Sequence, residues 1–379
     1  MMATAVTVVL LALVAGATVY TLLSLEAARR FLDAKATSAL NEWPPISILK
    51  PLAGLEDELE ANLRSFFEQE YPRFEVLMAV STEEDPALPL AHRVASAYPH
   101  VPHKIMVTGE PPYPNRKVCS LDRMVKASAY DLLVMSDSDI RVCPNMLRRI
   151  AAEFADSKLA LATCPYRAVP GSSLWSQLEA ILMNTEFWSG VLTAWLLEGM
   201  RFAVGPTIVA RKQVIEALGG FETLRHYLAE DFVLGQRAAE RGFGVSLSRY
   251  VVEHHIGNSG FRANAHHRLR WVRSTRRSRP AGYIGQLFTY PVPLALLLLW
   301  WSASWWPLCL VAFVLRMVAA WTVAVGILRD PLVRRKWWLV PLQDCFSFAF
   351  WLAGFAGNTI QWRGKVFYLE PDGKFREIR

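Results

Sequence analysis

Asp137 and Asp139 stand one residue apart and are the first candidates in this chain for metal chemistry. Two carboxylates at the end of a strand can hold a divalent ion, which could in turn meet the phosphates of a nucleotide-sugar donor. The same residue types also serve in turns and at helix N-caps, and a plausible turn at Cys143-Pro144-Asn145 follows closely. The pair alone therefore leaves both interpretations open.

Glu230 and Asp231 form a second acidic pair at the start of a predicted helix through Leu234, Ala238 and Arg241. A carboxylate at a helix start is stabilised by the helix dipole, so N-capping is the simpler interpretation of Asp231. The functional hypothesis is a general base, which removes the proton from an acceptor hydroxyl as its oxygen attacks the anomeric carbon of a sugar.

A basic and aromatic cluster follows at 266–271. Arg270 could neutralise a leaving diphosphate, and Trp271 could offer a flat face to the sugar or the acceptor. Membrane anchoring is the alternative, and it suits Arg276, Arg277 and Arg279 better. Two carboxylates, a separate base and a basic clamp form a consistent set for glycosyl transfer.

His254 and His255 are candidate additional metal ligands, although a histidine pair on a loop is more often structural. The five cysteines show neither metal-ligand nor redox spacing, which indicates structural thiols.

The segments that must position these residues alternate between short apolar runs and amphipathic stretches from Ile46 to about Val252, which predicts an α/β sheet. Predicted strands are Ile46–Leu49, Phe74–Val80, Lys104–Thr108 and Asp131–Met135, and predicted helices are Glu56–Glu70, Ala87–Tyr98 and Cys119–Ala129. The fourth strand runs directly into Asp137. Because ligands of open α/β sheets bind outside the carboxyl ends of the strands, this position favours a ligand site.

Met2–Leu25 is almost wholly apolar and uncharged, and at about 1.5 Å per residue it could cross a hydrocarbon core of roughly 30 Å. Charged residues follow it instead of a small-residue cleavage site, which favours a retained anchor over a signal peptide. Arg29, Arg30 and Lys35 lie just beyond it. The positive-inside rule therefore predicts that the following domain is cytoplasmic.

Three further candidate membrane segments are Leu287–Trp306, Pro307–Leu328 and Trp337–Gly357. If the third crosses fully, the basic tail ends on the opposite side from the preceding domain, whereas a re-entrant or interfacial helix keeps it on the same side. Arg316 and Asp344 lie within these segments, where a structural pairing is expected because isolated charge is costly there.

Phe187–Met200 is apolar, aromatic and short. It is expected either in the core or in the membrane interface, where it would help to admit a lipid acceptor. The net charge of +7 comes largely from residues beside hydrophobic segments, such as Arg334, Arg335 and Lys336. Attraction to anionic lipid explains that placement better than nucleic acid, which is not an expected partner.

Three motifs resemble those of ceramide glucosyltransferases and of related bacterial glycosyltransferases associated with hopanoid biosynthesis. They are 136–142 (SDSDIRV), 228–231 (LAED) and 268–271 (RLRW), within a similarity running from about Ile46 to Tyr290. The resemblance implies a GT-A fold, a UDP-sugar donor, Mg²⁺ or Mn²⁺ as cofactor, and inversion at the anomeric carbon.

The resemblance also implies roles for individual residues. It places the first acidic site, near the uridine, at Glu84 or Asp85, and the second at Asp137 and Asp139. The third, which is the expected base, is Asp231 beside Glu230.

Lys117 resembles the lysine that approaches the nucleotide, and Arg270-Trp271 matches the last motif. His267 stands where that motif has Gln or Arg, so the charge of this donor contact would depend on pH.

Residues 268–283, together with Thr289-Tyr290, look closer to the hopanoid-associated branch. The predicted reaction is transfer of N-acetylglucosamine to bacteriohopanetetrol at a bacterial inner membrane, with glucosylation of ceramide as the alternative. A processive polysaccharide synthase and a non-enzymatic membrane scaffold are weaker hypotheses. The predicted organisation is an anchor at 2–25, a cytoplasmic GT-A domain at 44–280, membrane segments at 287–357 and a basic tail at 361–379.

Overall fold

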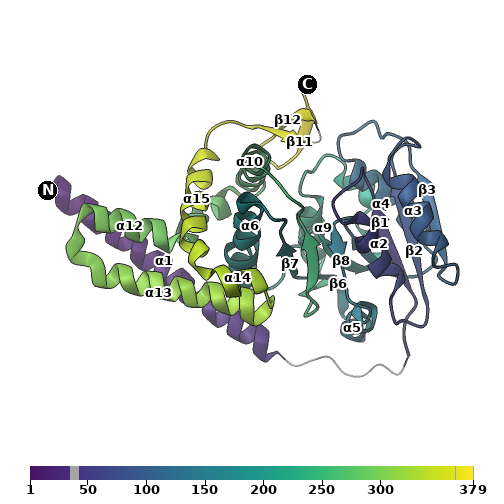
Figure 1. Ribbon diagram of the computed structural model, residues 1–379, viewed down its shortest axis with the longest axis horizontal. Coiled ribbons are helices and arrows are strands. Elements are labelled where there is room, and N and C mark those ends of the chain that lie inside the picture. The colour runs from purple at the N-terminus through teal and green to yellow at the C-terminus, as the bar shows by residue number, and fades with distance from the viewer. Residues whose placement is uncertain (35–41, 363, 379) are drawn as a thin grey trace.

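A computed structural model describes residues 1–34, 42–362 and 364–378 of the chain (Figure 1). Lys35, which entered the prediction of sidedness, lies outside the described residues, as do residues 363 and 379 of the predicted tail.

The centre of the fold is a seven-stranded, mostly parallel sheet. In sheet order its strands are β3 (His103–Val107), β2 (Phe74–Val80), β1 (Ile46–Pro51), β4 (Leu132–Ser136), β8 (Thr207–Arg211), β6 (Leu159–Thr163) and β9 (Gly244–Leu247). Only β8 runs antiparallel to its neighbours within this sheet. The predicted α/β class with a mostly parallel sheet is confirmed.

Helices cover both faces of the sheet because the strands are apolar on both sides. Every residue of β2 is buried. Val76 and Met78 share a core with α2 (Leu59–Phe67) and α3 (Ala87–Ser96), while Leu77 and Ala79 share the opposite core with α4 (Arg116–Ala127).

Helix starts differ from the predicted ones for local reasons. Helix α2 begins three residues after the predicted Glu56, because Glu58 has a left-handed backbone with φ of 65°. Helix α4 begins before the predicted Cys119, because the side chain of Asn115 accepts a hydrogen bond from the Val118 N–H at 3.2 Å and caps the helix earlier.

A three-stranded sheet lies beside the acidic loop. Its order is β5 (Ile140–Arg141), β10 (Val252–His255) and β7 (Tyr166–Val169). Strand β5 continues directly from Asp139, so this small sheet fixes the loop at the end of β4 from its far side.

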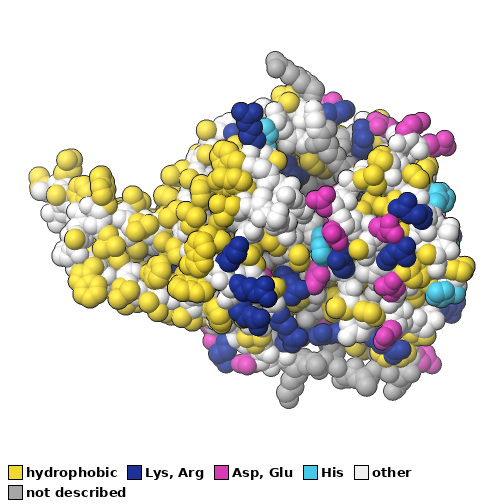
Figure 2. Space-filling view, in the orientation of Figure 1, with side chains coloured by type: hydrophobic (Ala, Val, Ile, Leu, Met, Phe, Trp, Pro, Cys, Tyr) yellow, Lys and Arg dark blue, Asp and Glu magenta, His cyan; other side chains and the backbone are white. Residues whose placement is uncertain are grey.

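Three helices form what we call the apolar lobe: α1 (Met2–Asp33), α12 (Pro291–Trp301) and α13 (Trp306–Trp321). They lie side by side, and the N-terminus is at the tip of the lobe (Figure 1). Hydrophobic side chains cover the lobe, whereas Lys and Arg gather where it meets the rest of the molecule (Figure 2). The helices at Met2–Asp33 and Ala303–Ile327 are long and apolar enough to cross a membrane.

The predicted segment Leu287–Trp306 is not one continuous helix. A bend of 62° separates Pro280–Thr289 from Pro291–Trp301. Pro291 and Pro293 lack the N–H groups that would continue the preceding helix, so a new helix starts there.

The segment predicted at Trp337–Gly357 contains α15 (Val340–Ala353), whose 14 residues extend only about 21 Å. The chain then forms the C-terminal sheet, with β11 (Thr359–Trp362), β12 (Lys365–Leu369) and β13 (Phe375–Glu377). The N–H of Phe375 donates to the His226 carbonyl at 2.9 Å, so this sheet lies against the α/β part. The C-terminal sheet therefore packs against the α/β part, and the crossing or re-entrant course of Trp337–Gly357 stays a prediction.

The expected pairing of Arg316 and Asp344 is confirmed. The guanidinium donates two hydrogen bonds to the carboxylate, at 2.9 and 2.7 Å, and both side chains are buried.

Three helical stretches connect the apolar lobe to the α/β part: α6 (Leu174–Ile181), the π-helix η1 (Leu182–Phe187) and α7 (Trp188–Glu198). Helix α7 packs on α1, where the hydroxyls of Ser24 and Thr193 lie 2.8 Å apart. The predicted helix Phe187–Met200 is therefore the last part of a longer helical run.

Candidate active site

Asp137 lies at the carboxyl end of β4 and forms an ion pair with Lys117 in the first turn of α4, with 2.7 Å between Lys117 Nζ and Asp137 Oδ1. Lys117 also meets Glu230 Oε1 at 3.2 Å. Burial opposes the charge on Lys117, but the two carboxylates hold its pKa above the ordinary value. The predicted lysine and acidic residues are thus brought together.

Lys50 was not foreseen as a site residue. Its side chain is fully buried at the end of β1, and its ammonium donates to the backbone carbonyl of Asp137. Burial lowers the pKa of Lys50 to about 7. The sequence contained one indication of this role, because Lys50 directly follows the apolar predicted strand Ile46–Leu49.

Asp139 uses one carboxylate oxygen and leaves the other without a partner. His254 Nε2 lies 2.9 Å from Asp139 Oδ2. Burial works against ionisation, but the His254 imidazole keeps the pKa of Asp139 below its ordinary value. Asp139 Oδ1 is buried and has no hydrogen-bond partner among the described residues. A buried, ionised oxygen of this kind fits a divalent cation.

The two histidines do not join the aspartates as a ready-made metal centre. In the described part of the chain, no three His, Cys, Asp or Glu side chains are grouped to hold a metal ion. His254 contacts the Asp139 carboxylate, while the His255 ring turns to Glu253 at 3.2 Å. The His255 N–H donates to the Asp139 carbonyl at 2.8 Å, so His255 supports the loop through its backbone.

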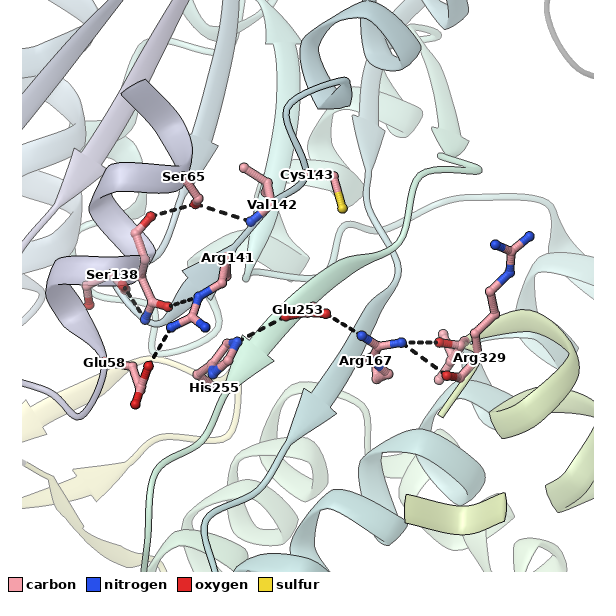
Figure 3. Close-up of polar contacts among 12 residues, drawn as sticks. Glu58, Ser65, Ser138, Arg141, Val142, Cys143, Arg167, Glu253, His255 and Arg329 are labelled. Atoms are coloured by element: carbon pink, nitrogen blue, oxygen red, sulfur yellow. Dashed lines mark hydrogen bonds and ion pairs between the residues drawn. The ribbon is translucent and has the colours of Figure 1, made fainter. Parts of the chain in front are cut away.

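Polar contacts brace the acidic loop on the side of β5 (Figure 3). Arg141 donates to Asn62 at 3.1 Å and to Glu58 at 2.8 Å. The Asn62 amide in turn donates to the Ser138 carbonyl at 3.4 Å. Helix α2 therefore holds the middle residue of the Asp137-Ser138-Asp139 loop.

A second set of contacts in Figure 3 leads from the small sheet to the apolar lobe. Glu253 accepts from Arg167, and Arg167 donates to the Arg329 carbonyl at 3.1 Å. Arg329 follows the π-helix η5 (Thr322–Ile327) that ends the α13 run. The strand that carries His254 is thus tied to the base of a candidate membrane span.

Asp231 is the second residue of α9 (Glu230–Glu240), and Ala229 occupies the N-cap without a side-chain hydrogen bond. Asp231 lies in a small recess, partly open to solvent, together with Lys117, Asp137 and Glu230. Burial and the neighbouring Glu230 raise the pKa of Asp231 to about 7. A carboxylate with this pKa can accept a proton near neutrality.

Gly205 lines this recess and Asn115 supports it through Glu230, and neither was predicted from the sequence as a site residue. A Cβ at Gly205 would lie 2.8 Å from Asp231 Oδ2, so only glycine leaves the carboxylate its place. The Asn115 amide donates to Glu230 Oε2 at 3.2 Å and to the Tyr227 carbonyl at 3.0 Å. The Gly205-Pro206 pair could have indicated a close approach of another side chain to the backbone. Asn115 could have been recognised only as a helix cap and not as a site residue.

Asp85 and Glu84 follow β2 at the same edge of the sheet. Asp85 Oδ1 accepts from the N–H groups of Gly54 and Ala87, each at 2.9 Å, and so joins the loops after β1 and β2. Glu84 is exposed. Both lie at the carboxyl edge of the sheet, and the hydrogen bonds of Asp85 go to the loops after β1 and β2 and not to the acidic recess.

The basic and aromatic motif lies on α10 (Phe261–Ser278). His267 pairs with the buried Glu179, and its ring lies 4.7 Å from that of Trp271. Trp271 reaches the site indirectly, through ring contacts from Phe187 to Tyr166 and from Tyr166 to His254.

Arg270 lies over the Trp362 ring of β11, 6.0 Å from the ring centroid. The clamp residue predicted for the diphosphate is therefore held by the C-terminal sheet.

The sequence profile of glycosyl transferase family 21 matches residues 7–375. The chain belongs to glycosyl transferase family 21. The match extends from the apolar lobe through the acidic recess to the C-terminal sheet, so it covers all the site residues described above.

Relatives of this family 21 chain include two proteins of Caenorhabditis elegans. Ceramide glucosyltransferase 1 is 29% identical over 209 residues, which are 55% of this chain and 44% of the relative. Ceramide glucosyltransferase 3 is 24% identical over 231 residues, which are 61% of this chain and 50% of the relative. The aligned region spans about half the length of these relatives.

A mannosyltransferase from Pyrobaculum calidifontis, solved in complex with GDP-Man and Mn²⁺, has a similar structure with a TM-score of 0.55 and 17% identity. The similarity covers 91% of this chain and 98% of the mannosyltransferase. At this identity the likeness concerns the fold, and it confirms the predicted GT-A architecture.

Proposed function

We propose that this glycosyltransferase moves a sugar from a UDP-sugar to the hydroxyl group of a membrane lipid, with inversion at the anomeric carbon. The observation that carries the proposal is the recess in which Asp231, with a pKa raised to about 7, lies with Lys117 and Asp137. A base that titrates near neutrality beside an ion-paired, strand-end carboxylate suits glycosyl transfer from a diphosphate.

In the proposed reaction, the Asp231 carboxylate removes the proton from the lipid hydroxyl. The electron pair on that hydroxyl oxygen forms the new bond to the anomeric carbon. The bond from the anomeric carbon to the diphosphate oxygen breaks at the same time. UDP leaves with the electron pair of the broken bond. Lys117 and Arg270 are the cations assigned to balance the charge of the departing diphosphate.

Asp137 and Asp139 would hold a divalent cation, and the free Oδ1 of Asp139 supports this assignment. Mg²⁺ or Mn²⁺ bound there would neutralise charge on the donor diphosphate. The mannosyltransferase with a similar fold was solved with Mn²⁺ and a nucleotide-sugar. The protein would contribute two carboxylates, with phosphate oxygens and water completing the shell.

Two acceptors are proposed. Bacteriohopanetetrol, with N-acetylglucosamine as the sugar, follows from the branch that residues 268–283 resemble. Ceramide, with glucose as the sugar, is favoured by the names of the aligned C. elegans relatives. We place the unit at 44–280 on the cytoplasmic face of a membrane, the bacterial inner membrane for the hopanoid alternative.

Purified protein incubated with UDP-glucose or UDP-N-acetylglucosamine and with ceramide or bacteriohopanetetrol tests the reaction, and mass spectrometry reads the product. We expect one lipid to gain one hexose or one N-acetylhexosamine. A ladder of products would instead indicate a processive synthase, and no glycolipid from any pairing would contradict the proposal.

Asp231→Asn tests the base. Turnover should fall by a factor on the order of 10² to 10⁴, because proton removal is lost. UDP binding should remain nearly unchanged. Glu240→Gln is the matched control, since Glu240 is exposed at the far end of the same helix. Undiminished transfer by Asp231→Asn would remove Asp231 as the base.

A further inference from the structure

Tyr166, at the start of β7, is a buried tyrosine that the proposed reaction does not use. Its hydroxyl makes no hydrogen bond within the described part of the chain. Tyr71, Tyr250, Tyr283 and Tyr290 are also buried, and the hydroxyl of each has a partner. These partners are the Pro44 carbonyl, the Cys143 N–H, the Trp351 carbonyl and the Glu186 carboxyl group. Because buried polar groups are normally hydrogen-bonded, the exception at Tyr166 indicates a partner that is not part of the chain.

The Tyr166 ring lies between the acidic loop and the basic and aromatic motif of α10. Its centroid is 5.1 Å from that of His254, whose imidazole contacts the Asp139 carboxylate. It also stacks on the Phe187 ring at 5.8 Å, and Phe187 contacts Trp271 at 6.3 Å. Tyr166 therefore belongs to a wall that two parts of the candidate site share.

Three carboxylates lie within electrostatic range of the Tyr166 hydroxyl. Burial raises the pKa of Tyr166, and the negative charges of Asp231, Glu179 and Asp139 raise it further. The phenol therefore keeps its proton at neutral pH and can act as a hydrogen-bond donor. In the proposed reaction Asp231 deprotonates the acceptor, and Asp139 lies at the diphosphate. The sugar passes from the diphosphate to the acceptor, so it must lie between these two carboxylates.

Two further polar atoms beside Tyr166 also lack partners. They are Nδ1 of His254 and Nε1 of Trp188, whose ring centroid is 5.0 Å from that of Tyr166. Both nitrogens are enclosed by protein, whereas the Tyr166 oxygen is not among the enclosed unpartnered atoms of the described residues. The Tyr166 hydroxyl is therefore the one of these three groups that is placed to meet a polar ligand.

We propose that the Tyr166 hydroxyl donates a hydrogen bond to a hydroxyl oxygen of the sugar that is being transferred, and so positions the sugar between the diphosphate and the base. The inference rests on the proposed glycosyl transfer. A sugar hydroxyl suits this position because it can accept from the phenol and still donate its own proton to a neighbouring acceptor.

Tyr166→Phe removes the hydroxyl and keeps the ring that packs on Phe187, Trp188 and His254. Full-length enzyme in detergent, with Mg²⁺ and without acceptor, is titrated with UDP. It is also titrated with UDP-glucose or UDP-N-acetylglucosamine, whichever supports transfer. We expect the affinity for the UDP-sugar to fall about five-fold, the loss for one neutral hydrogen bond, while the affinity for UDP does not change.

Tyr71→Phe is the matched control. Tyr71 belongs to the same apolar core, but its hydroxyl donates to the Pro44 carbonyl at 2.5 Å. This variant should lower the Tm and change neither affinity. An unchanged UDP-sugar affinity in Tyr166→Phe, or an equal fall for UDP and UDP-sugar, would overturn the inference and leave the proposed function standing. An unmodified enzyme that binds UDP but transfers no sugar to either lipid would overturn the proposed function, and this inference with it.

UDP-sugars that each lack one sugar hydroxyl identify the partner of Tyr166. For one donor of the series, Tyr166→Phe and the unmodified enzyme should bind with equal affinity, because the contact is already lost. A difference that persists for every donor of the series would contradict a contact with a sugar hydroxyl.

Discussion

Charged side chains of the candidate site restrain one another because they are largely shielded from water. Lys117 forms ion pairs with Asp137 and Glu230. Lys50 donates a hydrogen bond to the backbone carbonyl of Asp137. Asp231 forms no ion pair within the described part of the chain, so burial and the neighbouring Glu230 raise its pKa to about 7. The same recess therefore contains two ion-paired carboxylates, Asp137 and Glu230, and a third, Asp231, that can accept a proton near neutrality.

This pKa gives a pH dependence with a defined sign. Asp231 must be deprotonated to act as the base, so kcat/KM for the acceptor should rise as pH increases through about 7 and then level off. Initial rates at low acceptor concentration across neutral pH would measure it. The residual activity of Asp231→Asn should lack this rise, and a profile of the unmodified enzyme that is flat through neutrality would contradict the assignment.

Asp139→Ala should weaken UDP binding in the presence of Mg²⁺ or Mn²⁺ and change it little in their absence. The reason is the loss of the unpartnered Oδ1, which is assigned to the cation. Titration calorimetry with and without metal would measure the difference, and Asp156→Ala on an exposed turn is the control. Full metal-dependent affinity in Asp139→Ala would argue against ligation there.

Site residues were predictable where a local pattern contained them. Asp137 and Asp139 follow an apolar strand, and Asp231 begins a helix, so both positions can be found from neighbouring residues. Lys50 and Gly205 were missed because their roles arise between distant segments. Lys50 reaches Asp137 because β1 pairs with β4, and Gly205 matters because Asp231 lies against it.

At the scale of elements, the C-terminal sheet supports the segment that leads into α9, the helix that carries Glu230 and Asp231. Lys374 forms a β-bridge with Tyr227, and Phe375 shares an apolar cluster with Leu228. Asn115 holds the Tyr227 carbonyl from the other side. The turn before Glu230 and Asp231 is thus held between the start of α4 and the C-terminal sheet.

Phe375→Ala should loosen this support. Phe375 is 2% exposed, and removing a buried aromatic ring costs about 3 to 5 kcal/mol. Hydrogen exchange at Tyr227 and Leu228 should accelerate, and turnover should fall more than UDP affinity. Ile378→Ala is the control because Ile378 is 42% exposed. Unchanged exchange in Phe375→Ala would show that the turn is held without the sheet.

Four strands of the central sheet, β1 to β4, were predicted from short runs rich in apolar residues, and β2 has the predicted bounds. Strands β6, β8 and β9 were not assigned from the sequence. The C-terminal sheet was not predicted either. Its strands have three to five residues and no sustained alternation, and they are held by packing on Leu228 and on the α10 arginines. Arg316 and Asp344 could be paired in advance because charge within apolar segments has few acceptable partners.

At the scale of the whole molecule, the arrangement fixes which parts share a side. The C-terminal sheet and the α/β part lie together, while the turn between α12 and α13 is at the far end of the apolar lobe (Figure 1). If the lobe crosses the membrane, that turn is on the opposite face from both.

Cysteine labelling tests this arrangement. In a Cys143→Ser background, which removes the exposed native thiol, a membrane-impermeant reagent should label Ile378→Cys and Glu240→Cys from one face. It should label Ser304→Cys, in the turn between α12 and α13, only from the other. Labelling of Ile378→Cys together with Ser304→Cys would mean that α15 crosses the membrane fully.

The contact between the C-terminal sheet and the turn at Tyr227–Leu228 also has a consequence for synthesis. Residues 359–377 are translated after α12 and α13, so the turn at Tyr227–Leu228 gains this support only after the helices of the apolar lobe have been made. A nascent chain halted before β13 would already contain Asp137, Asp139 and Asp231 but not the strand that packs on the turn before Asp231. The turn before α9 would therefore reach its final packing only after the whole apolar lobe had been synthesised.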